Sequence, residues 1–154
     1  MGCNIEWEDL FREYFKDSYI IADLKTLDVG KLEVDLAYKA NVDACVCSGL
    51  APIATIKGFI DECHVKGLDA WIDSLGLSSN DLKRKIDELE SSKPDLIIIH
   101  RGIDEELAGA KNPWSMIKET KNHASTSLIA AAGGLTLDNI AIAQKQGADV
   151  LIIG

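Results

Sequence analysis

Three charged residues lie close together where an apolar segment ends. The segment reads "IIADLKTLDVG" and contains Asp23 and Lys25, with Asp28 three residues after the lysine. Alternate side chains of a strand project from one face, so the Asp23 carboxylate and the Lys25 ammonium would meet. Together the two charges offset each other's burial and can hold a third group. The spacing predicts either a structural ion pair or a site for an ionic ligand, while Asp28 reads on spacing alone as a solvated loop acid near a helix start.

Two further groups at the ends of apolar runs could take part in chemistry. His100 ends "PDLIIIH", where an imidazole either acts as a base near neutral pH or is a hydrogen-bonded rim histidine. Gly133 and Gly134 end "TSLIAAAGG"; they either let main-chain amides approach a phosphate or form an ordinary turn. Arg101 could assist that phosphate or pair with Asp104.

Short β-rich apolar runs alternate with segments of helical spacing. The runs cover residues 18–24, 42–49, 68–76, 94–100, 126–134 and 148–154. Helical stripes are expected at Leu32, Leu36 and Ala40, at Ile53, Ile56 and Ile60, and at Leu82, Ile86 and Leu89. Two later helices are expected to begin at the caps Asn112 and Thr136, and a first helix to bury Trp7, Phe11, Tyr14 and Phe15.

This alternation predicts an α/β fold with a parallel sheet of right-handed β/α units. An open doubly wound sheet and part of a (β/α)8 TIM barrel both fit. No Gly-x-Gly-x-x-Gly follows a strand, which counts against a dinucleotide-binding open sheet. In a barrel the strand ends share the rim where active sites lie. Polar residues and glycines recur at these ends: Asp23, Lys25, Ser48, Asp73, His100, Gly133 and Gly134.

Composition narrows the classes of function. The 154 residues are enough for one domain, taken as residues 1–154, and the formal charge of −9 argues against nucleic-acid or anionic-membrane partners. With no long apolar segment, we expect a cytoplasmic protein. The cysteines at positions 3, 45, 47 and 63 are expected to fill the core, with a soft-metal site as the alternative. His64 and His123 are expected at the surface.

The combination of these segments resembles the orotidine 5'-monophosphate decarboxylase suprafamily and, within it, the 3-hexulose-6-phosphate synthases. "ADLKTLDVG" is similar to the Asp-x-Lys-x-x-Asp motif on the third barrel strand of that family. The segments "VDACVCSGLAPIATIKGFI", "IIIHRGIDEE", "IAAAGGLTLDNI" and "GADVLIIG" are similar to its later strands. The resemblance covers the chain from about residue 18 to its end and implies an incomplete barrel of about six β/α units.

The resemblance also implies an activity and roles for residues. It implies an aldehyde-lyase that condenses formaldehyde with D-ribulose 5-phosphate to D-arabino-hex-3-ulose 6-phosphate, with Mg²⁺, in a homodimer. Asp23 would be a metal ligand, Lys25 would stabilise the enediolate, and His100 would move the proton at C1. Asp28 would reach into the partner's site. The phosphate would be held by Gly133, Gly134 and Gly154.

The sequence also departs from the family pattern. The two strands that precede the Asp-x-Lys-x-x-Asp motif in the family, the second with a metal-binding Glu, are absent here, and the chain ends at Gly154, before the closing segment. It is therefore expected to be a fragment of a longer synthase, a chain completed by another copy or chain, or an inactive remnant. Glu6, Glu8 or Asp9 could replace the missing Glu, although their spacing does not favour this.

Two other functions stay open from the sequence. One is a catalytically impaired subunit of the same fold that binds a phosphate ligand or serves in assembly. The other is decarboxylation of orotidine 5'-monophosphate. That reaction usually involves a lysine four residues before the motif's first aspartate, where this chain has Tyr19.

Overall fold

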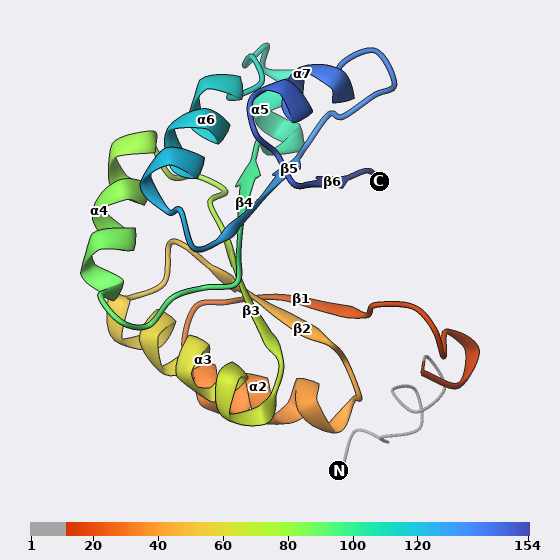
Figure 1. Ribbon diagram of the computed structural model, residues 1–154, viewed down its shortest axis with the longest axis vertical. Helices are drawn as coiled ribbons and strands as arrows, with labels where there is room; N and C mark the ends of the chain where they lie inside the picture. Colours follow the sequence, from red (N-terminus) through yellow and green to blue (C-terminus); the bar gives the residue numbers. More distant parts are fainter. Residues whose placement is uncertain (1–11) are drawn as a thin grey trace.

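The computed structural model describes residues 12–154, whose six strands form a single sheet (Figure 1). The strands are β1 (Ile21–Thr26), β2 (Ala44–Ser48), β3 (Asp69–Asp73), β4 (Leu96–His100), β5 (Leu128–Ala132) and β6 (Val150–Ile152). The helices are α2 (Gly30–Lys39), α3 (Ile53–Lys66), α4 (Ser79–Leu89), α5 (Ile103–Leu107), α6 (Trp114–His123) and α7 (Ile140–Lys145). All six predicted strands are thereby confirmed, each within a few residues of its expected limits.

The order of the strands decides between the two predicted architectures. Each strand pairs in parallel with the next strand in the sequence, in the order β1 to β6. A doubly wound sheet would reverse direction at a switch point, whereas a barrel continues to wind one way. Figure 1 shows the larger helices in an arc along the outside of the strands. The fold is an incomplete TIM-type barrel, as predicted.

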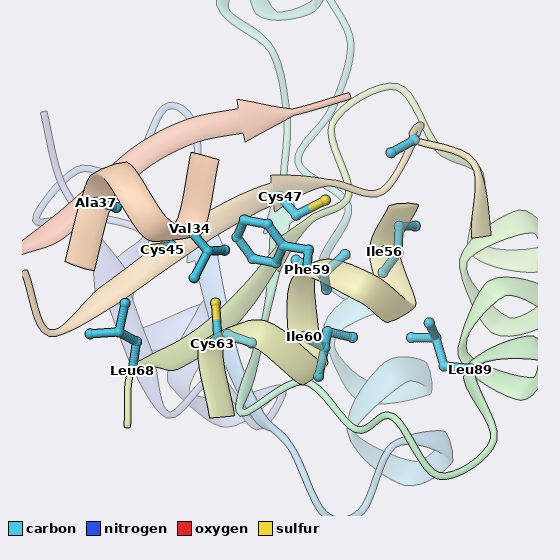
Figure 2. Packing of buried hydrophobic residues seen from close by; sticks show 13 residues of the cluster. Val34, Ala37, Cys45, Cys47, Ile56, Phe59, Ile60, Cys63, Leu68 and Leu89 are labelled. Carbon is cyan, nitrogen blue, oxygen red and sulfur yellow. The ribbon is translucent and has the colours of Figure 1, made fainter. Parts of the chain in front are cut away.

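Both faces of the sheet are apolar, as expected for parallel strands in a barrel. On the outer face, Phe59 and Cys63 of α3 pack against Cys45 and Cys47 of β2 (Figure 2). The inner face carries a separate cluster of Ala44, Val46, Trp71, Leu96, Ile98, Ala130 and Ala132. Because side chains alternate along a strand, residues 73 and 100 share the inner face with Trp71 and Ile98.

Aspartates placed just before three strands tie the amino-terminal ends of the sheet together. Asp43, Asp95 and Asp149 accept hydrogen bonds of 2.7 to 2.8 Å from the backbone N–H groups of Ile20, Ala70 and Ile129, respectively. Each carboxylate also contacts a basic side chain, Arg12, His64 or Lys121. These repeated contacts hold neighbouring strands in register at the end opposite the predicted site.

Several local predictions were wrong. In α2 the buried residues are Gly30, Val34 and Ala37, whereas Leu32 and Leu36 are exposed. The helix turns this way because Gly30 packs closely against Phe59 of α3.

The predicted starts of the last two helices were also wrong. α6 has Pro113 rather than Asn112 as its cap, and α7 begins at Ile140, because the chain from Thr136 first forms a turn. Tyr14 and Phe15 are exposed, not buried. Trp7, Phe11 and the acids Glu6, Glu8 and Asp9 lie outside the described residues.

Other predictions about single side chains are confirmed. Cys45, Cys47 and Cys63 are fully buried in the core, while His64 and His123 are exposed; Cys3 lies outside the described residues. Between residues 12 and 154, no helix combines the length and the apolar character needed to cross a membrane.

Candidate functional site

A hollow of about 420 Å³ opens at the carboxyl ends of the strands. Six of the seven predicted site residues line it: Asp23, Lys25, His100, Gly133, Gly134 and Gly154. Three more polar residues also line it, Asp73, Arg101 and Glu106. The parallel sheet thus brings together residues that are up to about 130 positions apart in the sequence.

Asp73 connects the two predicted catalytic side chains. Its carboxylate lies 2.8 Å from Lys25 Nζ and 2.9 Å from His100 Nδ1, and it accepts a 2.8 Å hydrogen bond from the Leu75 N–H. Asp73 is only 1% exposed. The sequence placed Asp73 among the polar residues at strand ends but indicated no role for it, because its partners come from other strands.

A distortion in β1 brings Lys25 to Asp73. Ala22 pairs with Cys45 and Thr26 with Cys47, so β1 has four steps where β2 has two. Within this bulge Lys25 adopts a left-handed backbone conformation, with φ of 48°. The ammonium consequently reaches Asp23 at 2.7 Å as well as Asp73, and the predicted ion pair between Asp23 and Lys25 is present.

The cluster fixes the charges of its members. Burial alone would lower the pKa of Lys25, but its hydrogen bonds to Asp23 and Asp73 outweigh this and raise that pKa above its ordinary value. Burial would raise the pKa of Asp73, yet hydrogen bonds from His100 and Lys25 hold that pKa below its ordinary value. At neutral pH, Lys25 is therefore a cation and Asp73 an anion.

The contact with Asp73 also orients His100. Since the Nδ1 atom faces the carboxylate, Nε2 is the ring nitrogen left to face a ligand. The backbone N–H of His100 donates to Ser74 Oγ at 3.2 Å, which holds the end of β4 beside that of β3. This arrangement suits proton transfer at Nε2 next to a fixed ammonium.

The two glycines form a tight turn after β5. Both have positive φ, 89° at Gly133 and 64° at Gly134. A Cβ on Gly133 would overlap the Arg101 carbonyl oxygen, so no other residue fits without displacing the backbone. Arg101 pairs with Glu106 at 2.8 Å rather than with Asp104. Both glycines line the hollow.

Asp28 lies away from the hollow. Its carboxylate accepts a 2.8 Å hydrogen bond from the Val29 N–H at the exposed start of α2. It lines a separate shallow depression with Gly30 and Gly58. The structure thus does not bring Asp28 to the other predicted site residues of its own chain.

The described residues by themselves do not fit a magnesium ion. Asp23 is exposed and lines the hollow, but both of its carboxylate oxygens contact Lys25, at 2.7 and 2.9 Å. Among residues 12–154 there is no group of three or more His, Cys, Asp or Glu side chains placed to hold a metal. Asp23 could supply one oxygen ligand of the several that Mg²⁺ requires.

Comparison with known proteins shows which family the chain resembles. The profile of the orotidine 5'-phosphate decarboxylase / HUMPS family matches residues 8–154. The chain belongs to this family. It is 45% identical over 145 residues to "Bifunctional enzyme Fae/Hps" of Methanocella arvoryzae. The aligned region covers 93% of this chain but only 36% of that protein. The chain thus spans about a third of the length of the curated relatives it matches.

Solved structures of similar proteins share the fold. A 3-hexulose-6-phosphate synthase from Salmonella typhimurium has a TM-score of 0.86 and 25% identity, covering 97% of this chain and 70% of that one. A 3-keto-L-gulonate-6-phosphate decarboxylase from Vibrio cholerae has a TM-score of 0.77 and 21% identity, with 97% and 69% covered. The solved structures show the shared fold, while the family profile and the curated relative confirm the predicted family resemblance.

Replacing Asp73 by Asn tests the charge cluster through the pH dependence of stability. Near neutral pH we expect the free energy of unfolding to fall by about 1–3 kcal/mol, because Lys25 and His100 lose a buried partner. The pKa of Asp73 is lowered in the folded state, so its contribution is complete above its unfolded pKa and is lost as pH falls through the folded value. The difference between wild type and D73N in urea unfolding should therefore shrink below about pH 4. A difference independent of pH would contradict this.

Gly133→Ala tests the tight turn, with Gly67→Ala as its matched control. Gly67 ends α3 with φ of 74°, and nothing lies within 4 Å of an added Cβ. G67A should cost about 1 kcal/mol in the free energy of unfolding, the strain of the positive φ alone. G133A should cost about 3 kcal/mol or more, since it adds the overlap with the Arg101 carbonyl. Equal costs in thermal unfolding would show that the turn is not close-packed.

Proposed function

We propose that this chain provides the active site of an aldehyde-lyase that acts on a sugar phosphate. The reaction is the condensation of formaldehyde with D-ribulose 5-phosphate to D-arabino-hex-3-ulose 6-phosphate, and its reverse. The observation that carries the proposal is the contact of Lys25 and His100 with Asp73, inside a hollow that also holds the Gly133–Gly134 turn. The names of the similar proteins agree with this class of substrate.

The geometry supports a division of roles. His100 Nε2 takes the proton from C1 of ribulose 5-phosphate, with Asp73 holding the ring and balancing the imidazolium that forms. The Lys25 ammonium stabilises the enediolate oxygen that develops beside it. The C1 carbanion centre then forms a bond to the formaldehyde carbon as the C=O π bond breaks, and the formaldehyde oxygen takes up the proton held by His100 Nε2. Each step keeps the phosphate unchanged.

The phosphate and the metal complete the proposal. Backbone amides of Gly133 and Gly134, together with Gly154, would receive the phosphate at the far side of the hollow. Among the predicted site residues, Asp23 would supply one oxygen ligand to Mg²⁺. Residues 12–154 place no group of three or more His, Cys, Asp or Glu side chains that would complete its coordination.

Asp28 fits the proposal through a homodimer. It lies outside the hollow of its own chain, in a depression that the exposed side chains of Val29 and Leu32 also line. Apolar side chains gathered in this way favour a protein partner. In a dimer formed through this surface, Asp28 would reach the hollow of the partner subunit.

Decarboxylation of orotidine 5'-monophosphate is less well supported. Tyr19, at the position where that activity usually involves a lysine, donates a hydrogen bond to Asp69 and stacks on Trp71. Asp69 begins β3, so this contact lies at the opposite end of the strand from the hollow. Tyr19 therefore contributes nothing to the Lys25 cluster.

The decisive experiment compares His100→Gln with His64→Gln. Both histidines contact an aspartate, at 2.9 Å for His100 and 3.0 Å for His64, but only His100 lines the hollow. With ribulose 5-phosphate, formaldehyde and Mg²⁺, H100Q should lower kcat by about 100-fold or more, because proton transfer is lost. H64Q should stay within about twofold of wild type.

The assay uses the 154-residue chain, with formaldehyde consumption as the measurement. A folded sample that binds phosphate but consumes no formaldehyde would favour the binding or assembly subunit instead. Equal activity of H100Q and wild type would contradict the role of His100.

A further inference from the structure

Arg101 is a buried cation at the edge of the hollow that the proposed proton transfer does not use. Its side chain is 9% exposed, and its Nη1 donates to the Ala110 carbonyl oxygen at 2.9 Å. Its Nε is buried and has no hydrogen-bond partner among the described residues. A guanidinium stays charged at every physiological pH, so its hydrogen-bonding capacity here is incompletely used.

The counter-charge of Arg101 lies where the phosphate is proposed to bind. The Glu106 carboxylate lies 2.8 Å from Arg101 Nη2 in an ion pair, and both side chains line the hollow. A Cβ on Gly134 would overlap the Arg101 guanidinium and the Glu106 carboxylate alike. The ion pair therefore lies directly against the Gly133–Gly134 turn, and the Glu106 carboxylate occupies the position proposed for the phosphate.

The two partners of this ion pair differ in how firmly they are held. Arg101 follows β4 directly, and its backbone N–H donates to Ala132 of β5 at 3.2 Å. Glu106 lies on α5, a helix of five residues with none buried, and its side chain is 41% exposed. Glu106 can therefore turn into solvent at little cost, whereas Arg101 stays at the turn.

We infer that Arg101 binds the phosphate group of the ligand and that Glu106 is an internal competitor, which the phosphate displaces. A phosphate brings more charge than a carboxylate and matches the guanidinium fork with two oxygens. A carboxylate left beside the phosphate would repel it, so binding requires Glu106 to leave. This inference rests on the proposed phosphate site. It adds Arg101 as the cation of that site and the displacement of the Glu106 carboxylate by phosphate.

Titration of the protein with inorganic phosphate, at constant ionic strength, tests the exchange. Glu106→Gln should bind phosphate about tenfold more tightly than wild type, because the competing charge is gone. Asp104→Asn is the matched control: it removes the same charge from the same helix, but Asp104 does not line the hollow. D104N should bind within about twofold of wild type.

Arg101→Gln, checked for folding by circular dichroism, should lose phosphate binding by about tenfold or more. Equal affinities of E106Q and D104N, or unchanged binding in R101Q, would overturn the inference while leaving the glycine turn as the phosphate site. Absence of phosphate binding in wild type and E106Q alike would overturn both the inference and that site. The lyase reaction is read separately by formaldehyde consumption, so failure of the proposed function is distinguishable.

Discussion

One buried carboxylate sets the geometry of the whole site. Asp73 is almost fully enclosed and can keep its charge only because Lys25 and His100 reach it from β1 and β4. The same two contacts hold Lys25 as a cation and occupy Nδ1 of His100, which leaves Nε2 as the ring nitrogen available to a ligand. An acid, an amine and an imidazole are thus positioned by one shared interaction, and none of the three orientations is independent of the other two.

The fold makes that interaction possible by winding in one direction. Sequential parallel pairing places the carboxyl ends of β1, β3, β4 and β5 along one rim, and the bulge in β1 moves Lys25 toward its neighbours. Within residues 12–154, β1 and β6 each pair with a single strand. Residues 12–154 therefore form a barrel that is left open between β1 and β6.

Much of this architecture was predictable from the sequence, because hydrophobic periodicity and strand-end residues are local signals. They indicated the six strands, the parallel sheet and the pair of Asp23 and Lys25. Asp73 was missed as the shared partner since its role depends on which strands are neighbours, which no local pattern reveals. The buried face of α2 was wrong for a similar reason: close packing of Gly30 on Phe59, not the stripe of leucines, sets its rotation. The catalytic, phosphate-binding and metal-binding roles of all seven predicted site residues stay predictions.

The tautomer of His100 tests the central interaction most directly. Nitrogen chemical shifts of ¹⁵N-labelled protein, recorded where the imidazole is neutral, distinguish a proton on Nδ1 from one on Nε2. If the charged Asp73 holds the ring, the proton lies on Nδ1 and Nε2 is a free base. A predominant Nε2–H form of His100 would contradict the account, because that nitrogen could not then accept a proton from a substrate.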